Sequence, residues 1–209
     1  MATFGDLLWI PEESLVRLAN RVRPFPPQDD AIPTDPPSGR MIDRLCGLYN
    51  LVHIIQLQDG FKLVIRIPAT GWGDNNTAEA KMAMKSQVTT LRLLAEETSV
   101  PVPSIYHFDT TSDNEIGAPY ICMSFVHGKM LLEVWFDQTL PTPLDERRLR
   151  TLRDVGFCMA ELDKFSFAKI GSLLEDDNGE LIVGPCYEYA GGVPARVAST
   201  GPYDTAAEF

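Results

Sequence analysis

Two β-rich runs joined by a short Asp-Gly turn constrain the fold of this chain more than any other feature. Residues 51–57 and 61–67 flank the turn at residues 58–60. Glycine tolerates the positive φ that such a turn requires, so the pattern predicts a β-hairpin. In the second run every other side chain is Phe, Leu or Ile, and Lys62 and Arg66 alternate with them. This alternation predicts an antiparallel sheet with one face buried and the other carrying charged groups.

Helices are expected on both sides of this hairpin. One is predicted at about residues 11–22 and another at about residues 77–97, where Asn76 and Glu79 resemble a capping pair. The second helix has an apolar stripe, formed by Met84, Val88, Leu91, Leu94 and Ala95. Residues 24–40 hold six prolines, which rarely fit helices or central strands, so this segment is predicted to be an extended linker.

A second pair of strands is expected at residues 104–109 and 119–126, joined by a polar turn. A five-stranded sheet needs one more strand, which residues 41–45 could supply. A long helix is then predicted with Thr142 as its cap and Pro143 at its first position. Its apolar stripe consists of Leu149, Leu152, Val155, Met159, Leu162 and Phe165.

The last hundred residues hold two more signals. Residues 170–174 and 180–183 predict a final hairpin around the turn at residues 176–179. Residues 205–208 carry a capping-box pattern, which predicts the start of a helix, but only Phe209 follows. A single helical turn cannot nucleate alone. From this pattern we expect the 209 residues to be the front of a longer protein.

Composition excludes several classes of protein. With 44% hydrophobic and 22% charged residues, the balance is that of a globular chain. The net charge of −11, concentrated beyond residue 100, repels a phosphate backbone, so we expect no nucleic-acid partner. The longest uncharged stretch, residues 45–58, is too short and polar to cross a membrane, and the N-terminus lacks a secretory signal. A cytoplasmic protein is expected, with its four cysteines reduced and mostly buried.

Six short segments, in this order, resemble the aminoglycoside phosphotransferase-like family of protein-kinase-like enzymes, particularly its fungal branch: residues 47–50, 63–68, 88–94, 98–103, 117–123 and 169–173. The resemblance implies an α+β fold in which a kinase-like small lobe, an antiparallel sheet with one inserted helix, precedes the beginning of a helical large lobe. It divides the chain into an N-terminal helical segment (1–23), the proline-rich linker (24–40), the small lobe (41–126), and the hinge with the incomplete start of the large lobe (127–209).

The resemblance also implies a site for ATP. The turn from Gly47 to Asn50 would lie over the phosphates, where small or polar residues let backbone N–H groups approach oxygens. Arg66 stands where kinases place a lysine on the third strand, and a guanidinium can grip two phosphate oxygens at once. Gln87 stands where the family has a glutamate paired with that base, and it can hydrogen-bond to Arg66 without supplying charge.

The hinge between the lobes would include Ser124 and Val126, with Met123 behind the adenine. Each assignment has a plainer alternative at this point. Residues 47–50 also suit an ordinary turn between strands, Arg66 a surface arginine, Gln87 a polar helix flank and Met123 a core position.

No catalytic residue and no metal ligand is identified in this chain. In the family, the catalytic and Mg²⁺-binding carboxylates lie in the large lobe. The series His107, Asp109 and Asn114 matches the spacing of a catalytic loop, but it lies before the last strand of the small lobe, so we interpret it as a β-turn. His127-Gly128 is followed by a lysine, and residues 176–179 suit a hairpin turn better than a metal loop.

Two hypotheses follow from the sequence. In the first, the chain is the nucleotide-binding portion of a phosphotransferase that, when complete, moves a phosphate from ATP, with Mg²⁺, to the hydroxyl of an unidentified small molecule. In the second, motivated by Gln87 and the missing catalytic segment, it is a truncated or degenerate pseudokinase that acts as a binding module. The sequence leaves the oligomeric state open.

Overall fold

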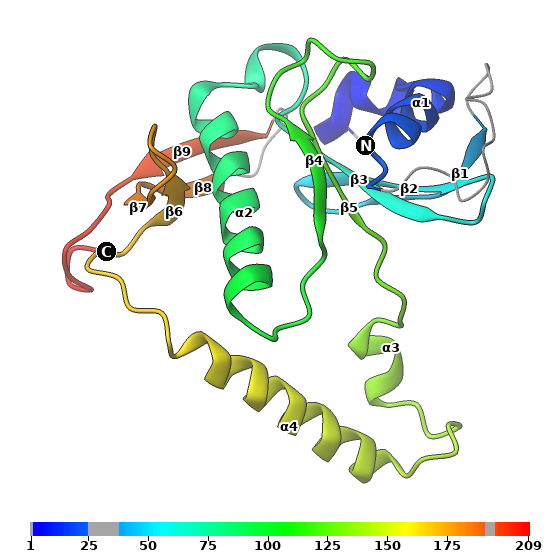
Figure 1. The fold of residues 1–209 in the computed structure, drawn as a ribbon, viewed down its shortest axis with the longest axis vertical. Helices are drawn as coiled ribbons and strands as arrows, with labels where there is room; N and C mark the ends of the chain where they lie inside the picture. The colour runs from blue at the N-terminus through cyan, green and yellow to red at the C-terminus, as the bar shows by residue number, and fades with distance from the viewer. Residues whose placement is uncertain (1, 25–37, 191–194) are drawn as a thin grey trace.

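A computed structural model describes residues 2–24, 38–190 and 195–209 (Figure 1). The protein is an α+β structure built on a five-stranded antiparallel sheet, as the sequence predicts. Most of the expected proline-rich linker lies outside the described residues. Its end differs from the prediction, because Gly39 and Arg40 already belong to the first strand and pair with Leu57 and Gln56.

The sheet follows the order β1-β2-β3-β5-β4, and every neighbouring pair is antiparallel. Its first three strands form a meander, and β5 returns beside β3. The predicted hairpin is confirmed: Gly60 has φ of 84° and the N–H of Phe61 donates to the Asp59 carboxylate. The strands are β1 (Gly39–Cys46), β2 (Asn50–Leu57), β3 (Lys62–Pro68), β4 (Ile105–Asp109) and β5 (Tyr120–Ser124).

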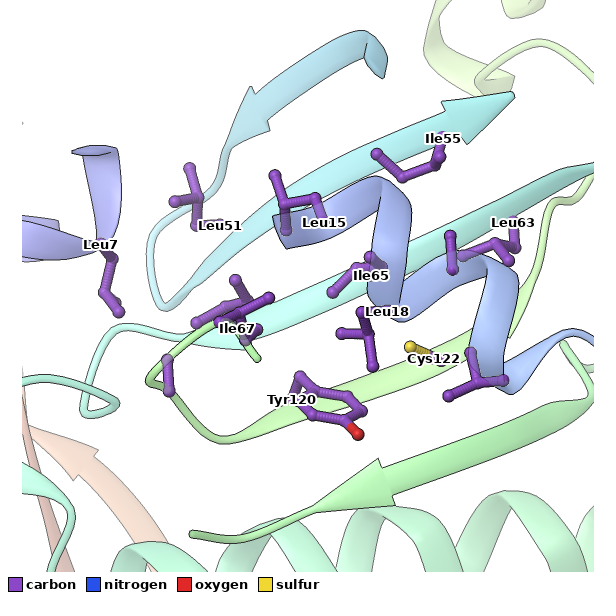
Figure 2. Close-up of a cluster of buried hydrophobic side chains, with 14 of the residues drawn as sticks. Leu7, Leu15, Leu18, Leu51, Ile55, Leu63, Ile65, Ile67, Tyr120 and Cys122 are labelled. Carbon is purple, nitrogen blue, oxygen red and sulfur yellow. The ribbon is translucent and has the colours of Figure 1, made fainter. Parts of the chain in front are cut away.

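One face of this sheet is covered by the 3₁₀ helix η1 (Ala2–Trp9) and by α1 (Glu12–Val22) (Figure 1). Figure 2 shows Leu15 and Leu18 of α1 above the strands, close to Ile65 and Tyr120. Burying each large apolar side chain of this kind contributes on the order of 2 kcal/mol. The alternation in β3 therefore has the expected outcome: Leu63, Ile65 and Ile67 point into this core and are fully buried.

The opposite face is packed against α2 (Ala78–Glu97), which follows a short 3₁₀ turn, η2 (Gly73–Asn75). Met84 and Val88 of this helix form a second buried cluster with Ile121 and Met123. The rest of the predicted stripe is less buried, because the helix extends past the sheet: Leu91 and Leu94 are half-buried and Ala95 is exposed.

The cap of α2 differs from the prediction by one residue. Thr77, not Asn76, is the N-cap, and its hydroxyl accepts a hydrogen bond from the N–H of Ala80. The amide of Asn76 instead donates to the carbonyl of Thr110, in the turn after β4. Both residue types cap helices well, so the sequence alone does not distinguish two adjacent candidates.

After the sheet the chain forms α3 (Leu131–Trp135) and α4 (Leu144–Leu162). The cap of α4 is also displaced by one residue, because Pro143 takes the N-cap position and the carbonyl of Thr142 accepts from the Arg147 guanidinium. None of the residues of α4 is buried. In Figure 1 the helix lies apart from the sheet, and its C-terminal end approaches that of α2, where the N–H of Ser99 donates to Glu161.

Two small hairpins complete the fold. The predicted one is confirmed as β6 (Ser172–Glu175) and β7 (Leu181–Gly184). The other, β8 (Cys186–Ala190) with β9 (Arg196–Thr200), is not predicted from the sequence. Instead of the helix announced at residues 205–208 there is one turn, in which the Glu208 carboxylate accepts from the N–H of Asp204.

The expectation of mostly buried cysteines is wrong. Only Cys122, in the centre of the sheet, is buried. Cys46 is exposed because β1 is an edge strand with little packed on either side, and Cys158 and Cys186 are half-buried. Across the described ranges, no helix combines the length and the apolar character needed to cross a bilayer.

Candidate functional site

Arg66 lies on the face of β3 opposite the main core. Because its strand neighbours Ile65 and Ile67 point toward α1, the side chain of Arg66 points toward α2. There its Nη2 donates a hydrogen bond to Oε1 of Gln87. The side-chain pairing expected from the sequence is therefore present, and it joins the third strand to the inserted helix.

The charge of Arg66 is not balanced by an acid. Of the carboxylates in the described part of the chain, none lies within ion-pair distance of its guanidinium. Burial lowers the pKa of Arg66 below its ordinary value, and the nearby Tyr189 acts in the opposite direction. A guanidinium nevertheless stays charged at neutral pH. The site therefore holds a half-buried positive charge whose side-chain hydrogen-bond partner, among the described residues, is a neutral amide.

Tyr189, in β8, is part of this site although the sequence did not indicate it. The Nε2 group of Gln87 donates to the Tyr189 hydroxyl over 2.8 Å. Burial raises the pKa of Tyr189, while the hydrogen bond from Gln87 and the charge of Arg66 lower it. The alternating aromatic residues in Cys186–Ala190 are typical of a strand, but they could not reveal that this strand places Tyr189 against Gln87 of α2.

The turn between β1 and β2 lies near Arg66 and on the same face of the sheet. Val52 is paired with Arg66 across the strands, and Asn50 is two residues from Val52, about 7 Å along the strand. The N–H of Ala69 donates to the carbonyl of Tyr49, which ties the turn to the end of β3. The structure therefore places Asn50, at the end of the turn, on the face of the sheet that carries Arg66.

The backbone of this turn is partly used within the turn itself. The N–H of Gly47 donates to the carbonyl of Asn50 over 2.9 Å, so this group is engaged and does not point outward for a ligand. A Cβ atom at Gly47 would lie 3.2 Å from the same carbonyl oxygen, which explains why a small residue suits the position. Leu48, at the tip, is exposed.

The three residues assigned to the hinge have different environments. Met123 is buried between α2 and the sheet with Met84 and Val88, which matches its alternative assignment as a core residue. The N–H of Ser124 donates to the carbonyl of Ser104, and the hydroxyl of Ser124 accepts from the N–H of Ser104. The polar groups of Ser124 therefore join β5 to the start of β4. Val126 lies beyond the strand and is exposed.

The sequence resembling a catalytic loop is a structural turn, as interpreted from its position. The Asp109 carboxylate accepts from the N–H and the hydroxyl of Thr111 and from the amide of Asn114. His107 is bonded through Nδ1 to the hydroxyl of Tyr120, 3.0 Å away. These groups are satisfied by one another and stabilise the end of β4.

The turn at residues 176–179 is likewise a hairpin turn, which confirms the prediction. Asp176 accepts from the N–H groups of Asn178 and Glu180, and Gly179 has φ of 80°. Within the described ranges, no three His, Cys, Asp or Glu side chains gather as metal ligands would.

No family model matches this chain. Two kinds of curated protein are similar to it. A subtelomeric hrmA-associated cluster protein of Aspergillus fumigatus is 31% identical over 131 residues, which cover 61% of this chain and 23% of that protein. The mitochondrial protein named altered inheritance of mitochondria protein 9 is 30% identical in Candida albicans, over 64% of this chain and 21% of the relative. The same protein of Candida tropicalis is also 30% identical over 64% of this chain. The chain thus spans less than a quarter of the length of these relatives.

These names correct the description expected from the sequence. The relatives from Candida species are named as mitochondrial proteins, so the expected cytoplasmic location is wrong. The relatives are named for mitochondrial inheritance and for a subtelomeric cluster, and not as aminoglycoside phosphotransferases.

Proposed function

We propose that this chain binds the phosphate groups of ATP and forms the nucleotide-binding part of a phosphotransferase that acts on a small-molecule hydroxyl. The observation that carries the proposal is the half-buried guanidinium of Arg66, which has no carboxylate partner among the described residues. Partial burial of a charge without an opposite charge costs solvation free energy, and an anionic ligand would offset that cost. Phosphate oxygens match the planar geometry of the guanidinium.

The position of Arg66 in the fold supports this proposal. An antiparallel sheet with one helix inserted after its third strand is the plan of a kinase small lobe, and here α2 follows β3 and packs on the sheet. In kinases a base on the third strand, paired with a residue of that helix, contacts the ATP phosphates. We assign Arg66 and Gln87 to these two roles, and their side chains are hydrogen-bonded to each other.

The described residues fit the phosphates of a nucleotide better than they fit its metal. Arg66 offers N–H donors beyond the one used by Gln87, and the turn at residues 47–50 lies on the same face. Mg²⁺ prefers carboxylate oxygens, and no suitable cluster occurs in the part of the chain that the structure describes. In this proposal the Mg²⁺ ligands and the catalytic carboxylate come from outside the described residues. The similar proteins of Aspergillus fumigatus and Candida albicans are several times longer than this chain, and the Candida protein is mitochondrial by name.

A second candidate function is nucleotide binding without phosphate transfer, as in a pseudokinase that serves as an interaction module. Gln87 favours it, because a neutral amide replaces the acid that completes the ion pair of active kinases. The exposed apolar side chains of α4 also suit a surface that is covered by another part of the protein or by a partner.

The test is a calorimetric titration of the chain with ATP, with and without Mg²⁺. Arg66→Ala removes at least one charge-assisted hydrogen bond, worth about 1.5–3 kcal/mol, so we expect binding to weaken by about 10- to 150-fold. Arg153→Ala, which removes the same charge from an exposed site on α4, is the control and should leave the affinity unchanged. Equal affinities for the wild type and Arg66→Ala would contradict the proposal.

A further inference from the structure

The β8–β9 hairpin reaches the candidate site from a distant part of the sequence. It lies beside α2 in Figure 1, and it places Tyr189 against Gln87, 102 residues earlier in the chain. The proposed function assigns no role to this hairpin. Tyr189 is half-buried and contacts both components of the site, helix α2 and the turn between β1 and β2.

The first contact determines the orientation of the Gln87 side chain. A guanidinium has only donors, so Gln87 must present its Oε1 to Arg66. The Nε2 group then points the other way and needs an acceptor, which the Tyr189 hydroxyl provides at 2.8 Å. Without that acceptor, the present orientation of the Gln87 amide is no longer stabilised by a hydrogen bond to Tyr189. The amide can then rotate and turn its N–H groups toward Arg66, and the helix no longer determines the position of the guanidinium.

The second contact reaches the turn between β1 and β2. The ring of Tyr49 packs against the ring of Tyr189, with centroids 5.2 Å apart. The Tyr49 hydroxyl also donates to the carbonyl of Tyr189 over 3.2 Å. One residue of the hairpin is therefore in contact with both groups that we assign to the phosphates, the turn and the Arg66–Gln87 pair.

From this geometry we infer that Tyr189 is a positioning residue of the phosphate-binding site. It acts through Gln87, and it holds that amide so that the remaining N–H groups of Arg66 face the bound phosphates. The inference rests on the proposed function, because it names what maintains the geometry of the same site. It adds that residues beyond the small lobe are needed for full nucleotide affinity.

The test uses Tyr189→Phe in the 209-residue chain, which removes one oxygen and keeps the ring that packs on Tyr49. Calorimetry with ATP and Mg²⁺ should give affinity about five-fold weaker than wild type, the effect of one neutral hydrogen bond. Tyr187→Phe, two residues away on the same strand, is the matched control and should bind as the wild type does.

A double-mutant cycle separates positioning from a general structural effect. If Tyr189 acts through Gln87, Tyr189→Phe should weaken binding in the wild type and change nothing in a Gln87→Ala background. A second readout needs no nucleotide: the side-chain amide signals of Gln87 in an NMR spectrum should shift and exchange faster with solvent in Tyr189→Phe. A purely structural role would weaken both backgrounds equally.

The outcomes distinguish this inference from the proposed function. If the wild type binds ATP and Arg66→Ala does not, but Tyr189→Phe binds normally or more tightly, the positioning role is overturned and the proposed function stands. If the wild type fails to bind ATP, both are overturned. Unchanged Gln87 amide signals in Tyr189→Phe would overturn the positioning role even if the affinity fell.

Discussion

Helices α1 and α4 both carry an apolar stripe in their sequences, but the two stripes lie in opposite environments. In α1 the apolar residues Leu15, Val16, Leu18, Ala19 and Val22 are all buried against the sheet. In α4 the corresponding stripe of Leu149, Leu152, Val155 and Met159 is 50–62% exposed. An apolar stripe thus predicts that a helix has a face to bury, but it does not say whether the neighbouring structure covers that face.

The difference extends to the segments around the two helices. The sheet half, residues 2–24 and 38–124, holds nearly all of the buried core of the described chain. The arm, residues 126–165, has exposed Val126, Met130, Leu132 and Phe136 before α4 begins. Because an isolated helix of this length is marginally stable in water, we attribute the stability of the protein to the sheet half. The candidate site, at Arg66 and Gln87, belongs to that half.

The largest expected effect comes from truncating one leucine in each helix. Leu18→Ala removes a fully buried side chain and leaves a cavity, so we expect the free energy of unfolding to fall by about 3 kcal/mol. Leu152→Ala, at a site that is 60% exposed, should change it by no more than about 0.5 kcal/mol. Urea denaturation followed by circular dichroism measures both. Similar losses would mean that α4 is as firmly packed as α1.

A smaller change in the free energy of unfolding is expected when the pH is lowered, and it should depend on a histidine of the sheet half and not on one of the arm. His53 in the sheet half is buried, its Nδ1 has no hydrogen-bond partner among the described residues, and burial lowers its pKa to about 4. The unfolded chain, with an ordinary pKa near 6.5, therefore binds protons more readily than the folded chain between about pH 6.5 and 4. Stability should be complete above this range and fall by about 2 kcal/mol on going from pH 7 to pH 5.

The matched variants are His53→Leu and His127→Gln. His53→Leu removes the buried group, so it should remove most of the pH dependence between pH 7 and pH 5 in urea denaturation. A smaller slope should remain from His107, because burial also lowers its pKa. His127→Gln changes an exposed histidine of the arm and should leave the wild-type pH dependence intact. A wild-type slope that persists in His53→Leu would show that other groups cause the acid sensitivity.

The sheet half was largely predictable from the sequence, because its signals are local. The Asp-Gly turn and the alternation in residues 61–67 predicted the hairpin and its buried face. The pairing of Arg66 with Gln87 followed from a family resemblance, and the contact is present. The role of this pair with phosphates stays a prediction, as do the division of the chain into lobes and the kinase-like identity of the fold.

Tyr189 could not be predicted, because its contribution depends on a contact between distant segments. Strand β8 spans only Cys186–Ala190, so no long alternation marks it in the sequence. The displaced cap at Thr77 has a different cause, since adjacent residues of equal capping ability differ only in the tertiary contacts that they make. Local propensity indicated these elements, and packing decided their limits and partners.

Hydrogen exchange with and without ATP and Mg²⁺ is the most direct test of the account. Nucleotide binding at Arg66 should slow exchange in the sheet half, in peptides that cover the turn at residues 47–50, strand β3 and helix α2, and should leave the arm unchanged. If exchange is unchanged throughout, or slows only in α3 and α4, then the nucleotide does not bind at Arg66 and the account is wrong.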